Sequence, residues 1–268
     1  MNQFDSPDGI FVVENGTIYI ADGFNNRIMK WNAGVSLGKI VAGGNGEGDS
    51  AAQLNFPVDL IVDSNGSLYI SDFGNNRVQK WLQGASNGET ILSNLNFTGI
   101  GQDDEGSLYT SDWKDYVVRK WPNNDTVGQI LASGFILPDR LFVDRNRSVY
   151  VVDRSDHSVI KINQDTGNIS VVAGGRFGQS VSTLYYPRGV TVDELGNVYV
   201  ADTMNHRIVR WSPGATSGIL IVGGRGDGSR SDQLYQPTDL QFDRYGNLYV
   251  ADSGNHRIQK FIIDKSLC

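Results

Sequence analysis

The sequence has very little cysteine and no long apolar run. One of its 268 residues is cysteine, Cys268, so no disulfide can form within the chain. Nowhere do about 18 apolar residues follow one another, and the first residues lack both the basic and the apolar segment of a signal peptide. We therefore predict no membrane contact. The sequence leaves the localisation unknown, and an extracellular location as part of a longer protein remains open.

Positive charge is scarcer than negative charge. The chain has 23 Lys and Arg against 30 Asp and Glu, a formal net charge of -7. Non-specific nucleic-acid binding depends on Lys and Arg that neutralise phosphates, so this balance disfavours a nucleic-acid partner. No nucleophile elbow, phosphate loop or metal-spaced Cys/His set is present either. We expect no catalytic residues and no enzyme activity.

Glycine, by contrast, is abundant, and the chain repeats itself. It has 32 glycines, which is typical of many tight turns between short strands. The string Tyr-x-x-Asp recurs six times, with spacings of 50, 40, 41, 49 and 50 residues between its aspartates. A period of about 40–50 residues is that of propeller blades. The aspartates, which we interpret as structural anchors of the repeat, are Asp22, Asp72, Asp112, Asp153, Asp202 and Asp252.

Each repeat reads as four short strands. In the fifth unit these are residues 189–193, 197–202, 207–211 and 219–224, rich in Val, Ile and Tyr and bounded by Gly, Asn, Asp and Pro. A glycine at the end of an Asp-x-x-Gly turn supplies the positive φ of a tight hairpin between the first two strands. The pattern predicts an all-β fold, a six-bladed β-propeller of four-stranded antiparallel blades, with residues 1–268 as a single domain.

The end of each unit resembles the NHL repeat. Residues 201–208 (ADTMNHRI), 251–258 (ADSGNHRI) and 21–28 (ADGFNNRI) carry the likeness, and so do the linking stretches at 41–57, 172–187 and 222–237. The resemblance covers essentially the whole chain and implies a six-bladed propeller. It implies several functions: protein-binding and RNA-binding platforms, sensor domains and, in one branch, a metal-dependent lyase.

One blade departs from the four-strand pattern. After Asp252 the chain reaches a third strand, at residues 257–263, and ends at Cys268, whereas the other blades need about eight to twelve more residues for an outer strand. We therefore expect one blade to lack its outer strand and the domain to belong to a longer protein. The alternative is a complete protein with a three-stranded blade and an exposed edge.

The three histidines are weak candidates for a metal site. His157, His206 and His256 each stand four residues after an anchoring aspartate, where the other blades have Asn or Tyr. They fall in three blades, so they are not expected to converge. The lyase branch implied by the resemblance needs further histidines at the blade starts, where this chain has Asp8, Val58, Thr98, Asp139, Arg188 and Thr238. We expect no metal and no cofactor, with a structural cation in the channel or the loops left open.

Two further repeated positions have a structural interpretation. An arginine five residues after the aspartate, as at Arg77 and Arg207, is expected to pair with that aspartate or with nearby loop carbonyls rather than to bind an anion. The tryptophans that end the third strands, Trp81 and Trp211 among them, are expected in the core rather than as a stacking platform for bases.

The repeats differ most in the loops after the second strands of the third and fourth units, where WKDY and RSDH replace the usual pattern. Exposed aromatic residues beside Lys or Arg are typical of binding hot spots. We predict a protein- or peptide-binding face on a domain that is monomeric, with a mixed-charge rim of Asp59, Arg140, Arg188 and Asp239 toward the axis. An alternative is that Trp113 merely covers a shorter loop, and the alternative function is an RNA-binding platform. The predicted contact residues are Trp113, Lys114, Tyr116, Arg154, Arg140, Arg188, Phe24 and Phe73.

Overall fold

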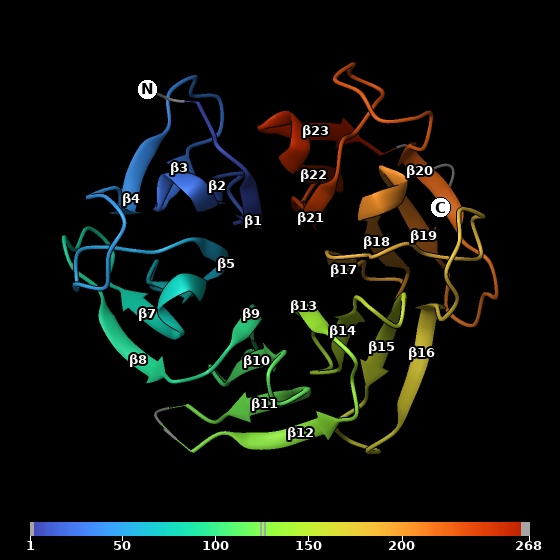
Figure 1. Ribbon diagram of the computed structural model, residues 1–268, viewed down its shortest axis with the longest axis horizontal. Coiled ribbons are helices and arrows are strands. Elements are labelled where there is room, and N and C mark those ends of the chain that lie inside the picture. Colours follow the sequence, from blue (N-terminus) through green and yellow to red (C-terminus); the bar gives the residue numbers. More distant parts are fainter. Residues whose placement is uncertain (1–2, 124, 126, 264–268) are drawn as a thin grey trace.

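Six antiparallel sheets stand around a central axis in this computed structural model, which describes residues 3–123, 125 and 127–263 (Figure 1). Five sheets have four strands, and the sixth has three within the described residues. The six-bladed propeller and the blade without a fourth strand are thus confirmed. Residues 264–268, at the expected end of the sixth blade, lie outside the described residues.

Within each blade the strands follow one another from the axis outward in chain order (Figure 1). The first three blades contain β1 (Pro7–Val12), β2 (Ile18–Asp22), β3 (Arg27–Trp31) and β4 (Lys39–Gly43); β5 (Pro57–Val62), β6 (Leu68–Asp72), β7 (Arg77–Trp81) and β8 (Glu89–Ser93); β9 (Phe97–Gln102), β10 (Leu108–Asp112), β11 (Val117–Trp121) and β12 (Gln129–Ser133). The last three contain β13 (Pro138–Val143), β14 (Val149–Asp153), β15 (Ser158–Ile162) and β16 (Ile169–Gly174); β17 (Val190–Val192), β18 (Val198–Asp202), β19 (Arg207–Trp211) and β20 (Ile219–Gly223); β21 (Pro237–Phe242), β22 (Asn247–Asp252) and β23 (Arg257–Ile262).

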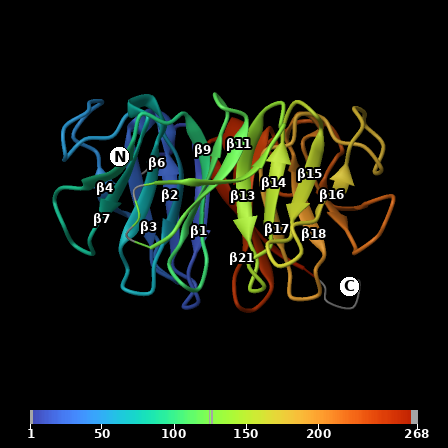
Figure 2. The ribbon, with the colours of Figure 1, turned by 90° about the horizontal axis from the view of Figure 1, so that it is seen from below.

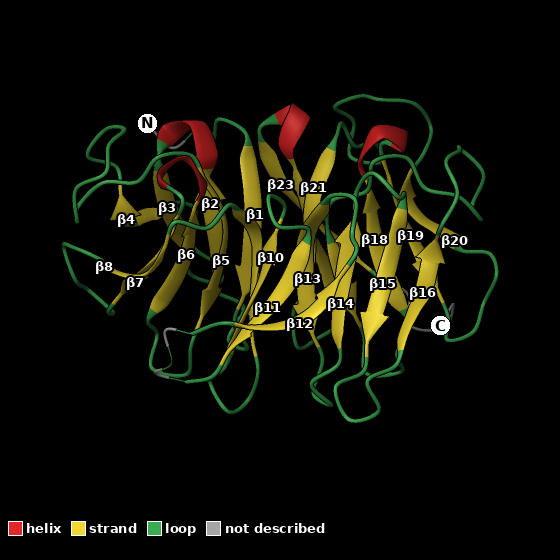
Figure 3. Cartoon of the chain, turned by 60° about the horizontal axis from the view of Figure 1, so that its bottom comes forward, coloured by secondary structure: helices red, strands yellow, loops and turns green. Residues whose placement is uncertain are grey.

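Short 3-10 helices mark one face of the ring, which we call the upper face (Figure 3). They connect the second and third strands in four blades, whereas the third and fourth blades have turns there. The hairpins between the first and second strands lie on the opposite, lower face (Figure 2). The 3-10 helices are η1 (Gly23–Asn25), η2 (Phe73–Asn75), η3 (Thr203–Asn205) and η4 (Ser253–Asn255).

The lower hairpins form as the Asp-x-x-Gly pattern predicts. The N–H of Gly66, at φ 78, donates to the carbonyl of Asp63 at 2.9 Å. The Asp63 carboxylate also accepts the N–H of Asn65 at 2.9 Å and of Ser67 at 2.8 Å. In the fourth blade Arg147 takes the place of the glycine with φ 60. A fixed turn at each hairpin sets the register of the inner strands and hence of the side chains that face the axis.

The hydrophobic core lies between adjacent blades, and the tryptophans of the third strands are part of it. Trp81, Trp121 and Trp211 are 2%, 7% and 1% exposed and pack against the preceding blade. Trp31, in the first blade, is half-buried and packs against the sixth. The assignment of these tryptophans to the core is confirmed.

The anchoring aspartates tie the upper loops to the sheets. The Asp72 carboxylate, which is fully buried, accepts hydrogen bonds from Arg77 Nε at 2.6 Å, Asn75 Nδ2 at 2.8 Å and the Asn55 backbone N–H at 2.7 Å. The expected arginine pairing is present in the first, second, fifth and sixth blades. In the third blade Arg119 Nε approaches Asp112 at 3.9 Å instead. The upper loops are therefore held at fixed positions on a rigid scaffold.

Candidate binding site at the axis and on the upper face

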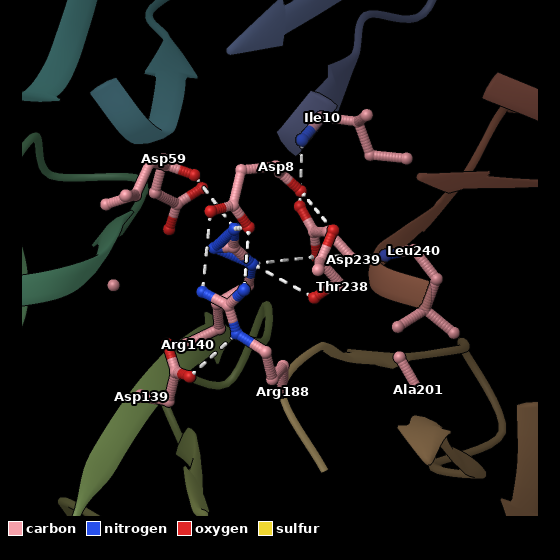
Figure 4. Close-up of polar contacts among 12 residues, drawn as sticks. Asp8, Ile10, Asp59, Asp139, Arg140, Arg188, Ala201, Thr238, Asp239 and Leu240 are labelled. Carbon is pink, nitrogen blue, oxygen red and sulfur yellow. Dashed lines mark hydrogen bonds and ion pairs between the residues drawn. The ribbon is translucent and has the colours of Figure 1, made fainter. Parts of the chain in front are cut away.

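The inner strands begin at the upper face with an irregular step. The pairing of β5 with β6 shifts register between Pro57 and Asp59, and the first, fourth and sixth blades have a similar shift at this place. Such bulges change the direction in which side chains point. Figure 4 shows the result, a set of charged side chains that converge on the axis. We call this set the axial cluster: Asp8, Asp59, Asp139, Arg140, Arg188 and Asp239.

The position two residues after the start of each blade alternates between glycine and a charged residue. The series is Gly9, Asp59, Gly99, Arg140, Gly189 and Asp239. A Cβ atom on Gly99 would lie 2.7 Å from the Asp139 carbonyl oxygen and 2.8 Å from the Arg140 Cα. The glycine of one blade thus leaves room for the backbone that carries the charged residue of the next. A six-bladed ring in this way places three charged side chains from alternate blades at its centre.

Two of the three central residues connect neighbouring blades in the same manner. Asp59 accepts the backbone N–H of Leu60 at 2.9 Å and that of Ile100, in the next blade, at 3.0 Å. Asp239 accepts the N–H of Ile10, in the first blade, at 2.8 Å. Because the sixth blade is joined to the first by this bond, Asp239 helps to close the ring.

Arg140 occupies the third central position, and it is buried rather than available to a partner. Only 2% of the residue is exposed. Its Nη2 donates to Asp8 Oδ1 at 2.6 Å and to the Val58 carbonyl at 2.8 Å, while its Nε donates to the Thr238 carbonyl at 3.2 Å. The sequence predicts Arg140 as a contact residue of the binding face. The structure instead places it inside the channel, because the bulge of β13 directs it to the axis.

Burial also shifts the protonation of the central carboxyls. It raises the pKa of Asp59 to about 7 and that of Asp239 to about 6, against an ordinary value of 3.8, although Arg140 opposes both shifts. Burial acts against the charge of Arg140, but Asp8 and Asp239 raise its pKa above the ordinary value. The centre therefore keeps a fixed cation and retains part of its carboxyl protons near neutral pH.

Above this centre lies a second layer of charged groups. Arg188 Nε is 3.1 Å from Asp139 Oδ2, and its Nη1 is 3.2 Å from Asp8 Oδ1. Burial alone would raise the pKa of Asp139, but the guanidinium groups of Arg188 and Arg140 hold it below its ordinary value. Asp8 and Asp139 thus serve as the carboxylate partners of the axial arginines. Arg188, unlike Arg140, keeps part of its side chain exposed, 18%.

Polar and apolar groups both line the channel beside the axial cluster. It contains a cavity of about 100 Å³ with Asp59, Arg140 and Asp239 among its lining. Its walls come from the inner strands, with the side chains of Ile10, Leu60, Ile100, Leu141, Val190 and Leu240. The charged groups therefore border a cavity of mixed polar and apolar lining, to which Gln102 and Gln241 also contribute.

On the upper face four aromatic side chains form a row across three blades, which we call the aromatic row: Phe24, Phe56, Phe73 and Trp113. Successive ring centroids are 5.0, 6.3 and 6.4 Å apart. Phe24 is 62% and Trp113 36% exposed, while Phe56 and Phe73 are half-buried. The structure thus brings three predicted contact residues together. It adds Phe56, which precedes the first strand of the second blade and was not among the predictions.

The remaining predicted residues lie to the side of this row. Lys114 and Tyr116 are exposed in the same turn as Trp113, and Tyr116 is 50% exposed. Arg154 belongs to the fourth blade, where its guanidinium lies 5.8 Å from the ring centroid of Tyr186. Trp113 stacks on Phe73 and is also partly exposed to solvent. It therefore both covers a neighbouring side chain and faces the solvent.

The histidines make similar contacts in three separate blades. Nδ1 of His157, His206 and His256 accepts a backbone N–H of the next blade, each at 3.1 Å. Asn26 Oδ1 does the same for the N–H of Phe56 at 2.8 Å. Among the described residues no three His, Cys, Asp or Glu side chains are arranged to hold a metal ion.

The repeats identify the family. The NHL repeat profile matches residues 54–81, 184–211 and 234–261. The protein is an NHL-repeat β-propeller. Comparison with curated proteins finds no match for this NHL propeller.

Solved structures share the fold of this NHL propeller at low sequence identity. A structural-genomics protein of unknown function from Bacteroides thetaiotaomicron is 17% identical, with a TM-score of 0.79 over 98% of this chain and 70% of that one. An auxiliary nutrient binding protein from the same species is 15% identical, with a TM-score of 0.75 over 96% and 69%. A virginiamycin B lyase from Staphylococcus aureus is 15% identical, with a TM-score of 0.62 over 98% and 86%. These likenesses show the propeller fold.

In the part of the NHL propeller that the structure describes, no helix has the length and apolar character needed to cross a membrane.

Proposed function

We propose that this NHL propeller is a non-catalytic binding module that recognises a protein or peptide on its upper face. The observation that carries the proposal is the aromatic row. Phe24, Phe56, Phe73 and Trp113 form a continuous run of rings across three blades, and the outermost two are well exposed. Large contiguous apolar patches are uncommon on soluble monomers and usually mark interaction sites.

The surroundings of the row support a protein ligand. Tyr116 and Lys114 extend it at the third blade, and Tyr186 and Arg154 lie on the fifth and fourth blades. Aromatic residues and arginine are the side chains that contribute most to protein–protein affinity. The loops that carry them are fixed by buried aspartates such as Asp72, so little ordering is needed when a ligand binds.

The comparison with an auxiliary nutrient binding protein is in keeping with a binding role for a propeller of this shape. Virginiamycin B lyase shares the same fold, so the fold does not decide between binding and catalysis. A binding role for this chain is therefore inferred from its own exposed side chains and not from the proteins that share its fold.

The test selects ligands from two random libraries, peptides displayed on phage and single-stranded RNA. The affinity of the selected peptides is then measured by calorimetry for the wild type and for Phe24→Ser and Trp113→Ser. Matched controls are Leu195→Ser and Tyr245→Ser, since these residues are 71% and 60% exposed on lower-face hairpins. We expect either upper-face change to weaken binding about tenfold or more, the loss of a hot-spot side chain, and the controls to leave it unchanged.

Three outcomes contradict the proposal. The first is that the selected peptides bind both upper-face variants as tightly as the wild type. The second is that peptide affinity falls only in the lower-face control variants. Enrichment of RNA without peptides would replace the proposed ligand by RNA.

A further inference from the structure

Arg154 stands at a position where this propeller otherwise has no charge. It follows the anchoring Asp153 at the upper end of β14 and is half-buried. Its Nε atom is buried without a hydrogen-bond partner among the described residues, and no carboxylate there lies within ion-pair distance of it. The corresponding residues of the other blades are Gly23, Phe73, Trp113, Thr203 and Ser253.

Neighbouring carboxylates are already engaged with other arginines. Asp8 contacts both Arg140, at 2.6 Å, and Arg188, at 3.2 Å. Asp139 contacts Arg188 at 3.1 Å. Asp239 also lies 3.8 Å from Arg140. The carboxylates of the axial region are therefore held by Arg140 and Arg188, and none of those described lies within ion-pair distance of Arg154.

The charge of Arg154 is also held in an unfavourable place. Burial and the nearby charge of Arg188 both lower the pKa of Arg154 from its ordinary value, and Asp139 only partly offsets them. A half-buried cation beside another cation is destabilised unless an anion joins the pair. An incoming carboxylate would meet the planar guanidinium of Arg154 beside the positive charge of Arg188, whose own Nε and Nη atoms already contact Asp139 and Asp8.

The Tyr186 ring lies beside Arg154 and is fixed in place. Its backbone N–H donates to His157 Nδ1 at 3.1 Å, and the two rings are 4.9 Å apart. Tyr186 has a φ of 45°, a conformation that the repeat also imposes on Ser6, Phe56 and Gln236 at the same place in other blades. The platform under Arg154 is thus formed before any ligand arrives.

We propose that Arg154 and Arg188 form a carboxylate-binding subsite at the upper end of the channel, and that the protein ligand presents an acidic group there. This inference rests on the proposed function of the upper face and names the chemistry of its partner. The carboxylate comes from an Asp or Glu side chain or from the C-terminus of the ligand, and the experiment separates these two sources.

The direct test follows the arginine Nε–Hε signals by NMR while small carboxylates are added to the whole chain. The probes are acetate, N-acetylglutamate amide, whose side chain is the only acid, and N-acetylglycylglycine, whose only acid is its C-terminus. Arg154→Lys and Arg188→Lys assign the two signals, and Arg244, exposed on a lower-face hairpin, is the internal control. We expect saturable shifts of the Arg154 and Arg188 signals and none at Arg244. The stronger of the two N-acetylated probes identifies the source.

A second measurement separates a ligand site from a structural role. Arg154→Gln removes a cation that makes no ion pair among the described residues, so at low salt the variant is expected to melt no earlier than the wild type. A fall in melting temperature would mean that Arg154 stabilises the fold through Asp139, and it would overturn the proposal. The proposal is also wrong if the NMR signals do not move, or if chloride moves them as much as acetate does.

The failure of this inference can be told apart from failure of the proposed function. If peptides selected on the upper face lose affinity in Phe24→Ser but bind Arg154→Gln unchanged, the binding face stands and the subsite is refuted. If the carboxylates bind while no peptide is selected, the subsite stands and the peptide ligand is refuted. Both proposals are supported if an acidic peptide binds Arg154→Gln about tenfold more weakly than the wild type, while the same peptide with Glu→Gln binds the two proteins with equal affinity.

Discussion

Nη2 of Arg140 lies 2.6 Å from Oδ1 of Asp8, and this ion pair joins the fourth blade to the first across the axis (Figure 4). Both side chains are nearly inaccessible, 2% and 3% exposed. Repeats in such arrays generally contact only their neighbours. Here one side chain also reaches the second and sixth blades, through the carbonyl oxygens of Val58 and Thr238. Arg140 therefore acts as a contact common to the ring rather than as a surface residue.

We expect Arg140→Met to lower the free energy of unfolding by about 3–5 kcal/mol, because it removes the more deeply buried of the two guanidinium groups that contact Asp8. Urea denaturation measures this change. The control is Arg145→Met, since Arg145 is 88% exposed in its pair with Glu194 and should cost about 1 kcal/mol or less. If both substitutions lower the free energy of unfolding equally, the buried Arg140–Asp8 pair stabilises the fold no more than an exposed ion pair does.

The raised pKa values of Asp59 and Asp239 predict a pH dependence of stability. In the unfolded chain their pKa is near 3.8, and in the folded protein it is about 7 and about 6. Because the folded state holds these protons more tightly, their contribution is fully present below pH 3.8 and is lost as pH rises through about 6 to 7. Asp139, whose pKa is lowered, acts in the opposite sense, so the comparison must be made between variants.

The measurement is the free energy of unfolding of the wild type minus that of Asp59→Asn/Asp239→Asn, from about pH 4.5 to about pH 8. Each asparagine also disturbs a backbone hydrogen bond, which shifts the difference by a constant amount. We expect the difference to become less favourable to the wild type as pH rises. A difference that stays constant across this range would show that the two carboxyls are ionised throughout.

The glycines beside the axis predict a steric effect. A Cβ on Gly99 would lie 2.7 Å from the Asp139 carbonyl oxygen and 2.8 Å from the Arg140 Cα, and backbone cannot move aside as a side chain can. We expect Gly99→Ala to cost about 3 kcal/mol in thermal or urea unfolding, at the upper end for overpacking. Gly34→Ala, at φ 75 with nothing within 4 Å of the added carbon, should cost about 1 kcal/mol from its backbone conformation alone. A smaller cost at Gly99 than at Gly34 would contradict the close contact.

The repeat and its local contacts are predictable from the sequence because they recur at short, constant spacing. Asp72 and Arg77 are five residues apart in one hairpin, and the same pair returns in three other blades. Neighbouring strands of a blade fix this geometry without knowledge of the rest of the ring. The six-bladed fold follows from counting such units.

The axial cluster could be predicted only in part. The sequence predicts a mixed-charge rim of Asp59, Arg140, Arg188 and Asp239 toward the axis, but it does not indicate that Arg140 is buried there. Whether Arg140 faces solvent or the axis depends on the bulge in β13 and on Asp8, a partner 132 residues away in the chain. Phe56 lies between Phe24 and Phe73, which belong to two different blades, and the sequence pattern of one repeat does not indicate this contact.

For the histidine position, another blade of the same chain supplies the natural comparison. Nδ1 of His206 accepts the Gln236 backbone N–H at 3.1 Å, while in the first blade Asn26 Oδ1 does the same for Phe56 at 2.8 Å. His206 and Asn26 also share the left-handed conformation, with φ of 54° and 52°. Asparagine tolerates this conformation and supplies an equivalent acceptor.

We therefore expect His206→Asn to change the free energy of unfolding by less than about 0.5 kcal/mol, as is usual for substitutions that break no contact. His206→Ala should cost about 1–3 kcal/mol, because it leaves the Gln236 N–H without its acceptor. Urea denaturation of both variants is the measurement. If Asn and Ala cost the same, the N–H is satisfied in another way and the contact does not hold the fifth and sixth blades together. If only Ala is costly, histidine at this position is a replaceable hydrogen-bond acceptor, and its recurrence in three blades has a structural cause that needs no metal.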